Sequence, residues 1–234
     1  MEITFYGLVY AIGFITSYLT IKYYFKKIKK QELTYRATTY LILGTLIGAR
    51  LLYVLYYDPS MLLNPLRILL IQKGGLSFHG GLLGAFIASH LFCKSNNINL
   101  KEFGDVLAKP LIFFLALGKI ANYINQESYG KITEIDWCVQ LSTINGCRHP
   151  VQLYESIAYF SLFIILIFYS KKGELKPGQE FLTMISAYSI IRFFIDFFRE
   201  YQWSFLDLGA GQYLNLITFT ISTVFLYKYS KKYK

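Results

Sequence analysis

Charged residues are scarce in this chain of 234 residues, at 16% of the sequence, whereas a soluble domain carries about 25%. Apolar residues account for 54% and aromatic residues for 18%. This balance excludes an ordinary soluble domain and indicates an integral membrane protein. The net charge of +10 is compatible with nucleic acid or anionic lipid, but the charges stand in short clusters between apolar runs. We therefore interpret them as topology-setting charges and expect the lipid bilayer, and no nucleic acid, as a partner.

Cysteine is almost absent, with three residues in the whole chain. Cys138 and Cys147 flank Asn145-Gly146, a turn signal, and either form a disulfide on an oxidising exterior or remain unlinked thiols. Together with His149 they are a conceivable set of metal ligands. A second close pair of cysteines or histidines is missing, so the sequence argues against a metal site.

Low-complexity segments, obvious repeats and long linkers are missing as well. The loops between apolar runs are short, and the largest one predicted to lie outside covers about 128–150. We therefore predict a single transmembrane helical domain over residues 1–234, in which most backbone polar groups are satisfied inside helices.

Long apolar runs make up most of the sequence. Seven of them are long enough to cross a bilayer as helices: 4–25, 36–57, 76–93, 105–127, 151–170, 179–199 and 210–228. With the N-terminus outside, the inner loops contain 14 lysines and arginines. The outer loops then contain only Arg67, Lys73, Lys131 and Arg148. The positive-inside rule predicts an all-α bundle of about seven spans with the N-terminus outside and the C-terminus inside.

The outer end of the fourth run is unusually polar for a membrane segment. If the helix continues through it, Lys119, Asn122 and Gln126 lie on one face at i, i+3 and i+7. They then present one cation and two amide groups to a single anionic ligand. The alternative is a set of interhelical hydrogen bonds that merely holds the bundle together.

The sixth run contains three charged residues at helical spacing. Arg192, Asp196 and Arg199 recur at i, i+4 and i+7, and Arg192 and Asp196 can pair. Three ionised groups are too costly for lipid contact. The planar fork of arginine suits phosphate, so the face is either an anion site or an ion-pair network between helices.

Two further polar clusters stand at the outer ends of the third and fifth runs. His79 lies in a glycine-rich stretch and is either a general base near neutral pH or a histidine bonded to a neighbouring helix. Gln152 and Glu155 point along one stripe of the fifth run, whereas Arg148 at its entry either binds substrate or anchors the interface. Arg50 lies within the second run after Gly44 and Gly48, which would let another helix come close, and its spacing assigns it no role.

All four outer clusters are predicted to lie at the same leaflet. A channel would spread polar groups through the full thickness of the membrane, and a transporter would centre them near the midplane. One-sided placement favours an enzyme that acts on a lipid head group or an exported substrate at the outer face.

Several blocks of the chain, in order, are similar to one family. The blocks are Tyr6–Tyr10, Gly48–Tyr53, Gly75–Gly84, Gly118–Gly130, Arg148–Glu155, Arg192–Arg199 and Gly211-Gln212. Together they resemble prolipoprotein diacylglyceryl transferase. The resemblance implies a seven-helix plasma-membrane enzyme with an outward-facing active site and without a metal or redox cofactor. By the same resemblance, such an enzyme is expected to transfer the diacylglyceryl group of phosphatidylglycerol to the lipobox cysteine thiol of a prolipoprotein, so that a thioether forms and glycerol phosphate leaves.

The resemblance also implies site residues. The expected catalytic residues are His79, Lys119, Glu127, Arg192 and Asp196. The expected substrate-binding residues are Tyr6, Asn122, Asn125, Gly130, Arg148, Gln152, Glu155 and Arg199. In this interpretation His79 is the base for the incoming thiol, and Lys119 and Arg192 hold the phosphate. The three acidic residues orient the cations or share the acid–base work, and the asparagines with Gly130 shape the head-group pocket.

Two positions depart from the family's usual pattern. The family usually has arginine at the position of Lys119 and glutamate at the position of Asp196. Lysine keeps the charge but loses the bidentate fork. Two alternatives therefore stand beside the transferase: a divergent paralogue that uses another lipid or acceptor, and a catalytically silent protein that binds lipid or prolipoprotein.

Overall fold

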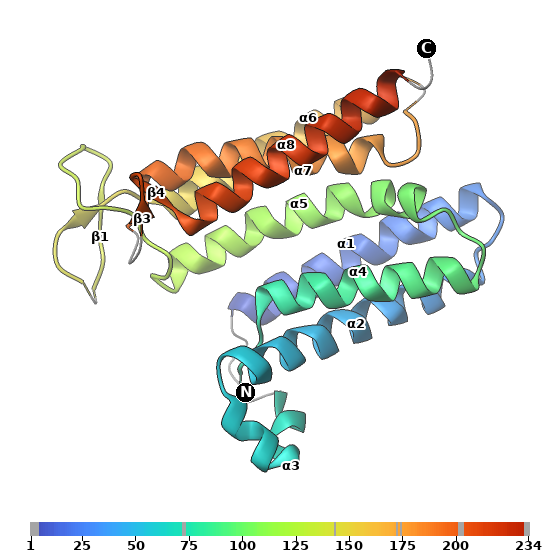
Figure 1. The fold of residues 1–234 in the computed structure, drawn as a ribbon, viewed down its shortest axis with the longest axis horizontal. Coiled ribbons are helices and arrows are strands. Elements are labelled where there is room, and N and C mark those ends of the chain that lie inside the picture. The colour runs from blue at the N-terminus through green and yellow to red at the C-terminus, as the bar shows by residue number, and fades with distance from the viewer. Residues whose placement is uncertain are drawn as a thin grey trace. The chain divides into compact units, whose positions relative to one another are not determined.

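The computed structural model describes residues 5–71, 74–142, 144–171, 173, 175–200 and 204–231. Helices dominate these residues (Figure 1). The α-helices are α1 (Phe5–Lys27), α2 (Leu33–Tyr56), α3 (Pro65–Leu69), α4 (Phe78–Ser95), α5 (Leu100–Ile124), α6 (Val151–Lys171), α7 (Gln179–Ile195) and α8 (Ala210–Lys231). Two 3-10 helices, η1 (Pro59–Leu63) and η3 (Asp196–Phe198), stand between them. Two small antiparallel hairpins complete the description: β1 (Val139–Gln140) with β2 (Cys147–Arg148), and β3 (Ser204–Phe205) with β4 (Leu208–Gly209).

The largely helical fold predicted from the sequence is confirmed. Four described segments are long and apolar enough to cross a membrane: Phe5–Lys27, Leu33–Tyr56, Val151–Lys171 and Gln179–Phe198. Helices α4, α5 and α8 coincide with the other three predicted runs. The count of seven spans and their orientation stay predictions.

The chain divides into two compact units, Thr16–Phe103 and a second unit made of Met1–Ile15 with Gly104–Lys234. In the first unit, α2 and α4 pack at glycine contacts. A Cβ atom at Gly48 would meet the backbone of Gly80 and Gly84, and one at Gly84 would meet the backbone of Gly44 and Gly48. The close helix approach predicted for Gly44 and Gly48 is therefore confirmed, and small residues are what permit it.

This contact gives a sharp stability prediction. Gly84→Ala is expected to lower the free energy of unfolding by about 1–3 kcal/mol, because its Cβ would overlap backbone that cannot turn aside. Gly81→Ala is the matched control on the same helix, since its Cβ would find its nearest neighbours at 3.4 Å or beyond. Thermal unfolding of both variants in detergent checks the difference. Equal stability of the two variants would contradict the close-packing argument.

The second unit has its own apolar core between α5, α6 and α7. Its buried members are Ala108, Ile112, Ala116, Tyr159, Leu162, Leu166 and Met184. Asp105 fixes the register of α5 against α7, because its carboxylate accepts the N–H of Gly178 at 2.5 Å and that of Phe181 at 2.8 Å. A carboxylate at a helix N-terminus satisfies the free N–H groups there. The same register sets the position of Lys119, which lies further along α5.

Candidate active site

Glu155 on α6 is the centre of a buried ionic cluster in the second unit. Its side chain is fully buried, and its Oε2 lies 3.0 Å from Lys119 Nζ and 2.5 Å from Arg199 Nη2. Arg192 Nη1 contacts the other oxygen, Oε1. Three cations from α5, α7 and the end of η3 thus meet one carboxylate. A buried carboxylate requires such partners, because an unpaired charge in the interior is strongly unfavourable.

Asp196 is the second carboxylate of this cluster. Its Oδ1 lies 3.2 Å from Arg192 Nε and 3.1 Å from Arg199 Nε. The predicted pairing of Arg192 with Asp196 is therefore confirmed. The prediction of one continuous helix face through Arg199 was wrong, because α7 ends at Ile195 and Asp196 opens the 3-10 helix. The tighter turn brings Arg199 back to the carboxylate three residues earlier.

The cluster carries a formal charge of +1, from the three cations against the two carboxylates. It also has unused hydrogen-bonding capacity. Arg199 Nε and Asp196 Oδ1 are buried and make an ion pair, but neither atom has a partner at hydrogen-bond geometry. A buried N–H without an acceptor is an unfavourable state that a bound oxygen anion would relieve.

A second polar group lies one helical turn away from the cluster, after Lys119 on α5 and before Glu155 on α6. Tyr6 on α1 donates its hydroxyl to Glu127 Oε2 at 2.5 Å. Asn122 Nδ2 contacts the Tyr6 hydroxyl at 2.5 Å and Glu127 Oε2 at 3.3 Å. Gln152 Nε2 donates to the carbonyl of Glu127 at 2.6 Å. Because Asn122 follows Lys119 by three residues and Gln152 precedes Glu155 by three, the two groups are neighbours on their helices.

Gln126 does not join this face, so its predicted alignment with Lys119 and Asn122 was wrong. Helix α5 ends at Ile124, and Gln126 has a φ of 57°. Its Oε1 instead accepts hydrogen bonds from Ser142 N at 2.9 Å and Ser142 Oγ at 2.8 Å. Asn125, also beyond the helix, hydrogen-bonds the Tyr6 hydroxyl. The polar end of the fourth run is thus a turn that ties the helix to the loop.

Gly130 and Arg148 hold this loop together. Arg148 Nη1 donates to the Gly130 carbonyl at 3.0 Å and pairs with Glu200 at 2.6 Å, and its guanidinium lies 4.8 Å from the Tyr129 ring centre. A Cβ at Gly130 would meet the carbonyl oxygens of His149 and Phe198, so the position requires glycine. These contacts are structural, and a role of Arg148 in substrate binding stays a prediction.

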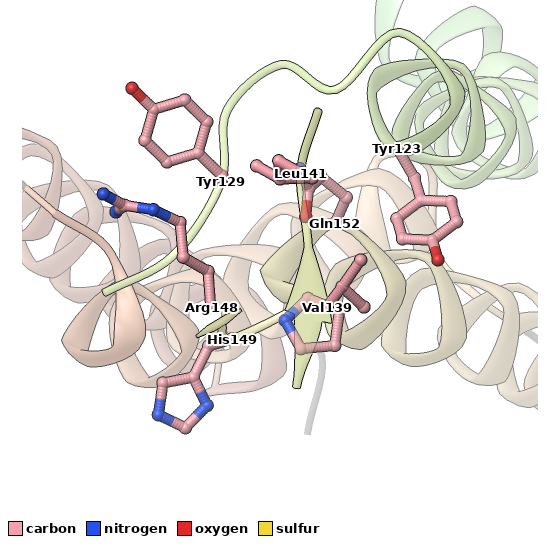
Figure 2. Close-up of a pocket in the computed structure, with 8 residues that line it drawn as sticks. Tyr123, Tyr129, Val139, Leu141, Arg148, His149 and Gln152 are labelled. Atoms are coloured by element: carbon pink, nitrogen blue, oxygen red, sulfur yellow. The ribbon is translucent and has the colours of Figure 1, made fainter. Parts of the chain in front are cut away.

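A small cavity lies beside Arg148, with His149 and Gln152 also at its wall (Figure 2). Its volume is about 10 Å³. A single water requires at least about 10–15 Å³, so the cavity has no room for a lipid head group. The substrate-binding prediction therefore rests on the ionic cluster and its neighbours rather than on this cavity.

Cys138 and Cys147 form a disulfide at the β1–β2 hairpin. This decides between the two alternatives left open by the sequence, and it removes both thiols from any set of metal ligands. Across the described part of the chain, no group of three or more His, Cys, Asp or Glu side chains stands together as a metal site.

His79 belongs to the other unit, Thr16–Phe103. It lies in the first turn of α4, exposed, with its ring 5.7 Å from that of Phe78. Sequence reasoning missed two further neighbours of the cluster. Tyr159 approaches Glu155 Oε1 at 3.4 Å, as its i+4 spacing would have suggested, and Asn215 approaches Asp196 Oδ2 at 3.5 Å, for which the sequence gives no signal.

The described residues thus define a helical protein with candidate membrane spans and a buried ionic site of net positive charge. The chain belongs to the prolipoprotein diacylglyceryl transferase family, whose sequence profile matches residues 1–228. The resemblance inferred from the motifs is confirmed.

Curated relatives agree with this assignment. A Bacteroides fragilis protein named phosphatidylglycerol–prolipoprotein diacylglyceryl transferase is 34% identical over 254 residues, covering 99% of this chain and 91% of the relative. A Geobacter sulfurreducens protein of the same name is 33% identical over 205 residues, covering 86% and 79%. One from Oleidesulfovibrio alaskensis is 37% identical over 206 residues, covering 86% and 77%.

Proposed function

We propose that this chain transfers the diacylglyceryl group of phosphatidylglycerol to the lipobox cysteine of a prolipoprotein. Its family and the names of its relatives support this reaction. The single structural observation that carries it is the buried cluster around Glu155, with its excess of one positive charge. The phosphodiester of phosphatidylglycerol carries one negative charge, so the bound lipid would neutralise the cluster.

The cluster's second task concerns the leaving group. The cysteine sulfur attacks the glyceryl carbon, and the carbon–oxygen bond to phosphate breaks with its electron pair on the phosphate oxygen. The phosphodiester thereby becomes a monoester, whose charge at neutral pH is closer to −2. Lys119, Arg192 and Arg199 stabilise this added charge, and a preorganised site does so without rearranging at the moment of reaction.

The thiol must lose its proton, because the thiolate is the nucleophile. His79 takes that proton in our proposal, since an imidazole accepts protons near neutral pH. The hydrogen-bonded group of Tyr6, Asn122 and Glu127 lies one turn from the cations and binds the hydroxyls of the glycerol head group.

We also propose that the enzyme lies in the plasma membrane with this site facing outward. The excess of inner over outer lysines and arginines supports that orientation. The Cys138–Cys147 disulfide supports it independently, because such bonds persist on the oxidising side of the membrane.

A direct assay tests the reaction. Purified protein is incubated with phosphatidylglycerol and a lipobox peptide, and the peptide mass is followed. A diacylglyceryl adduct is expected with the cysteine peptide and not with its Cys-to-Ser analogue. An adduct formed only from phosphatidylethanolamine or phosphatidic acid would identify a divergent paralogue, and lipid binding without any adduct would identify a silent binding protein.

Lys119→Arg tests the departure from the family's usual residue. Arg192 and Arg199 already occupy the Glu155 oxygens, so a third guanidinium would crowd a site in which the lysine side chain is 17% exposed. We expect kcat/KM for phosphatidylglycerol to fall about tenfold, which corresponds to the lower range of overpacking costs. Lys109→Arg on the same helix is the control. A rate above that of the wild type would mean that lysine is a defect rather than an adaptation.

A further inference from the structure

Arg50 on α2 is a buried cation that binds backbone rather than a counterion. Its residue is 5% exposed, and within the described residues it pairs with no carboxylate. Its Nη2 donates to the carbonyl of Arg67 at 2.6 Å and its Nε to that of Ile68 at 2.8 Å. Its Nη1 donates to the carbonyls of Gly74 and Gly75, both at 2.8 Å. One side chain therefore holds two stretches of the segment that precedes α4.

Side-chain packing does little to hold this segment in place. A cavity of about 220 Å³ is lined by Arg50 and Tyr53 from α2 and by Arg67, Gly74 and Gly75 from the segment, among others. Leu69 of the segment is 74% exposed, and Leu70 lines the cavity. Within the described residues, the four hydrogen bonds of Arg50 join α2 to residues 67–68 and to residues 74–75.

The segment leads directly into the turn that carries His79. Ser77 N donates to the carbonyl of Ala49 at 2.9 Å, and Ala49 is the residue before Arg50. Ser77 caps α4, since its Oγ accepts the N–H of Gly80. Two consecutive residues of α2 thus fix residues 74–77, and His79 follows in the first helical turn. Any displacement of the glycine pair would move the start of α4 and the imidazole with it.

We propose that Arg50 is a positioning residue for the transfer reaction, and that it acts by fixing the glycine segment that orients His79. The proposal rests on the proposed function, in which His79 is the base for the thiol. Arg50 itself touches no reacting atom. Its guanidinium reaches both carbonyl pairs, because its five N–H donors form a rigid planar fork.

Arg50→Lys is the first test. Lysine retains the charge, but its three donors radiate from one atom and cannot span both carbonyl pairs. We expect kcat to fall about a hundredfold, the cost of a misplacement of about 1 Å, with the KM for phosphatidylglycerol unchanged. Hydrogen exchange should rise at the amides of Ser77, Gly80 and Gly81 and stay unchanged in α5 and α6.

Gly75→Ala and Gly74→Ala form a matched pair that tests the contact between Arg50 and the glycine segment by changing the segment instead of Arg50. Both glycines have positive φ, at 80° and 84°, so both substitutions carry the same kind of backbone cost. Only at Gly75 would the new Cβ meet Arg50 Nη1 and the Tyr53 ring, whereas at Gly74 it would meet nothing within 4 Å. The fall in kcat for Gly75→Ala should exceed that for Gly74→Ala by about tenfold.

The outcomes separate this inference from the proposed function. Wild-type kcat in both Arg50→Lys and Gly75→Ala would overturn the role of Arg50 while leaving the transferase activity intact. Exchange that rises throughout the protein, or a KM that changes as much as kcat, would also overturn it in favour of a merely structural role. Absence of any adduct from the wild-type protein would instead remove the proposed function itself.

Discussion

Arg192→Ala should lower diacylglyceryl transfer by about a thousandfold, the upper range for removing one charge-stabilising donor from an active site. Arg192, like Arg199, joins both carboxylates of the cluster. Its Nη1 contacts Glu155 and its Nε lies 3.2 Å from Asp196. Its loss changes the formal cluster charge from +1 to 0. The buried site would then carry no net positive charge to attract the phosphate of the substrate. Single-turnover assays with phosphatidylglycerol and a lipobox peptide measure the effect.

A control must separate lost chemistry from lost stability. Lys109 on α5 makes a partly buried ion pair with Glu180 on α7 at 2.5 Å, in the same unit as the cluster. Lys109→Ala therefore removes a comparable ion pair that the reaction does not use. We expect this variant to retain transfer activity within about threefold while losing a similar amount of stability. Retained activity in Arg192→Ala, or equal loss in both variants, would argue that the cluster only holds the helices together.

The helices were largely predictable because membrane spans are a matter of length and apolar content. The run at 151–170 became α6 at Val151–Lys171, and the run at 179–199 became α7 with its 3-10 extension. The helix end at Ile124 was not predictable, because local turn geometry decides it and the hydrophobic pattern does not record that geometry. The i, i+4 pair of Arg192 and Asp196 was predictable because both partners lie on one element.

The remainder of the site depends on which helices are neighbours, and a single sequence does not contain that information in readable form. That acidic residues would orient the cations followed from the family resemblance. That Glu155 would contact three of them did not, since the three come from separate elements. The sequence assigns Arg50 no role for a different reason. Its partners are backbone carbonyls, which every residue has, so no residue type could have pointed to them.

Glu155→Gln is expected to lower the free energy of unfolding by about 3–5 kcal/mol, because it leaves buried cations without their shared partner. The formal cluster charge rises from +1 to +2, with only Asp196 left against three cations. The amide is nearly isosteric, so the loss reports charge rather than a cavity. In a chain of this size each 1 kcal/mol shifts Tm by about 2–4 °C, so the unfolding midpoint in detergent should fall by roughly 6–20 °C.

A second substitution that removes one cation should restore much of this loss. Arg199→Gln in the Glu155→Gln background returns the formal charge to +1, from two cations against Asp196. A double-mutant cycle on the unfolding midpoints then isolates the interaction of the two residues. Additive losses would mean that Glu155 is not the electrostatic centre of the cluster. Recovery of stability without recovery of transfer is the expected result, because Arg199 holds the buried N–H that the substrate phosphate would satisfy. Charge balance would then explain the stability of the folded site, and the number of cations would explain its transfer activity.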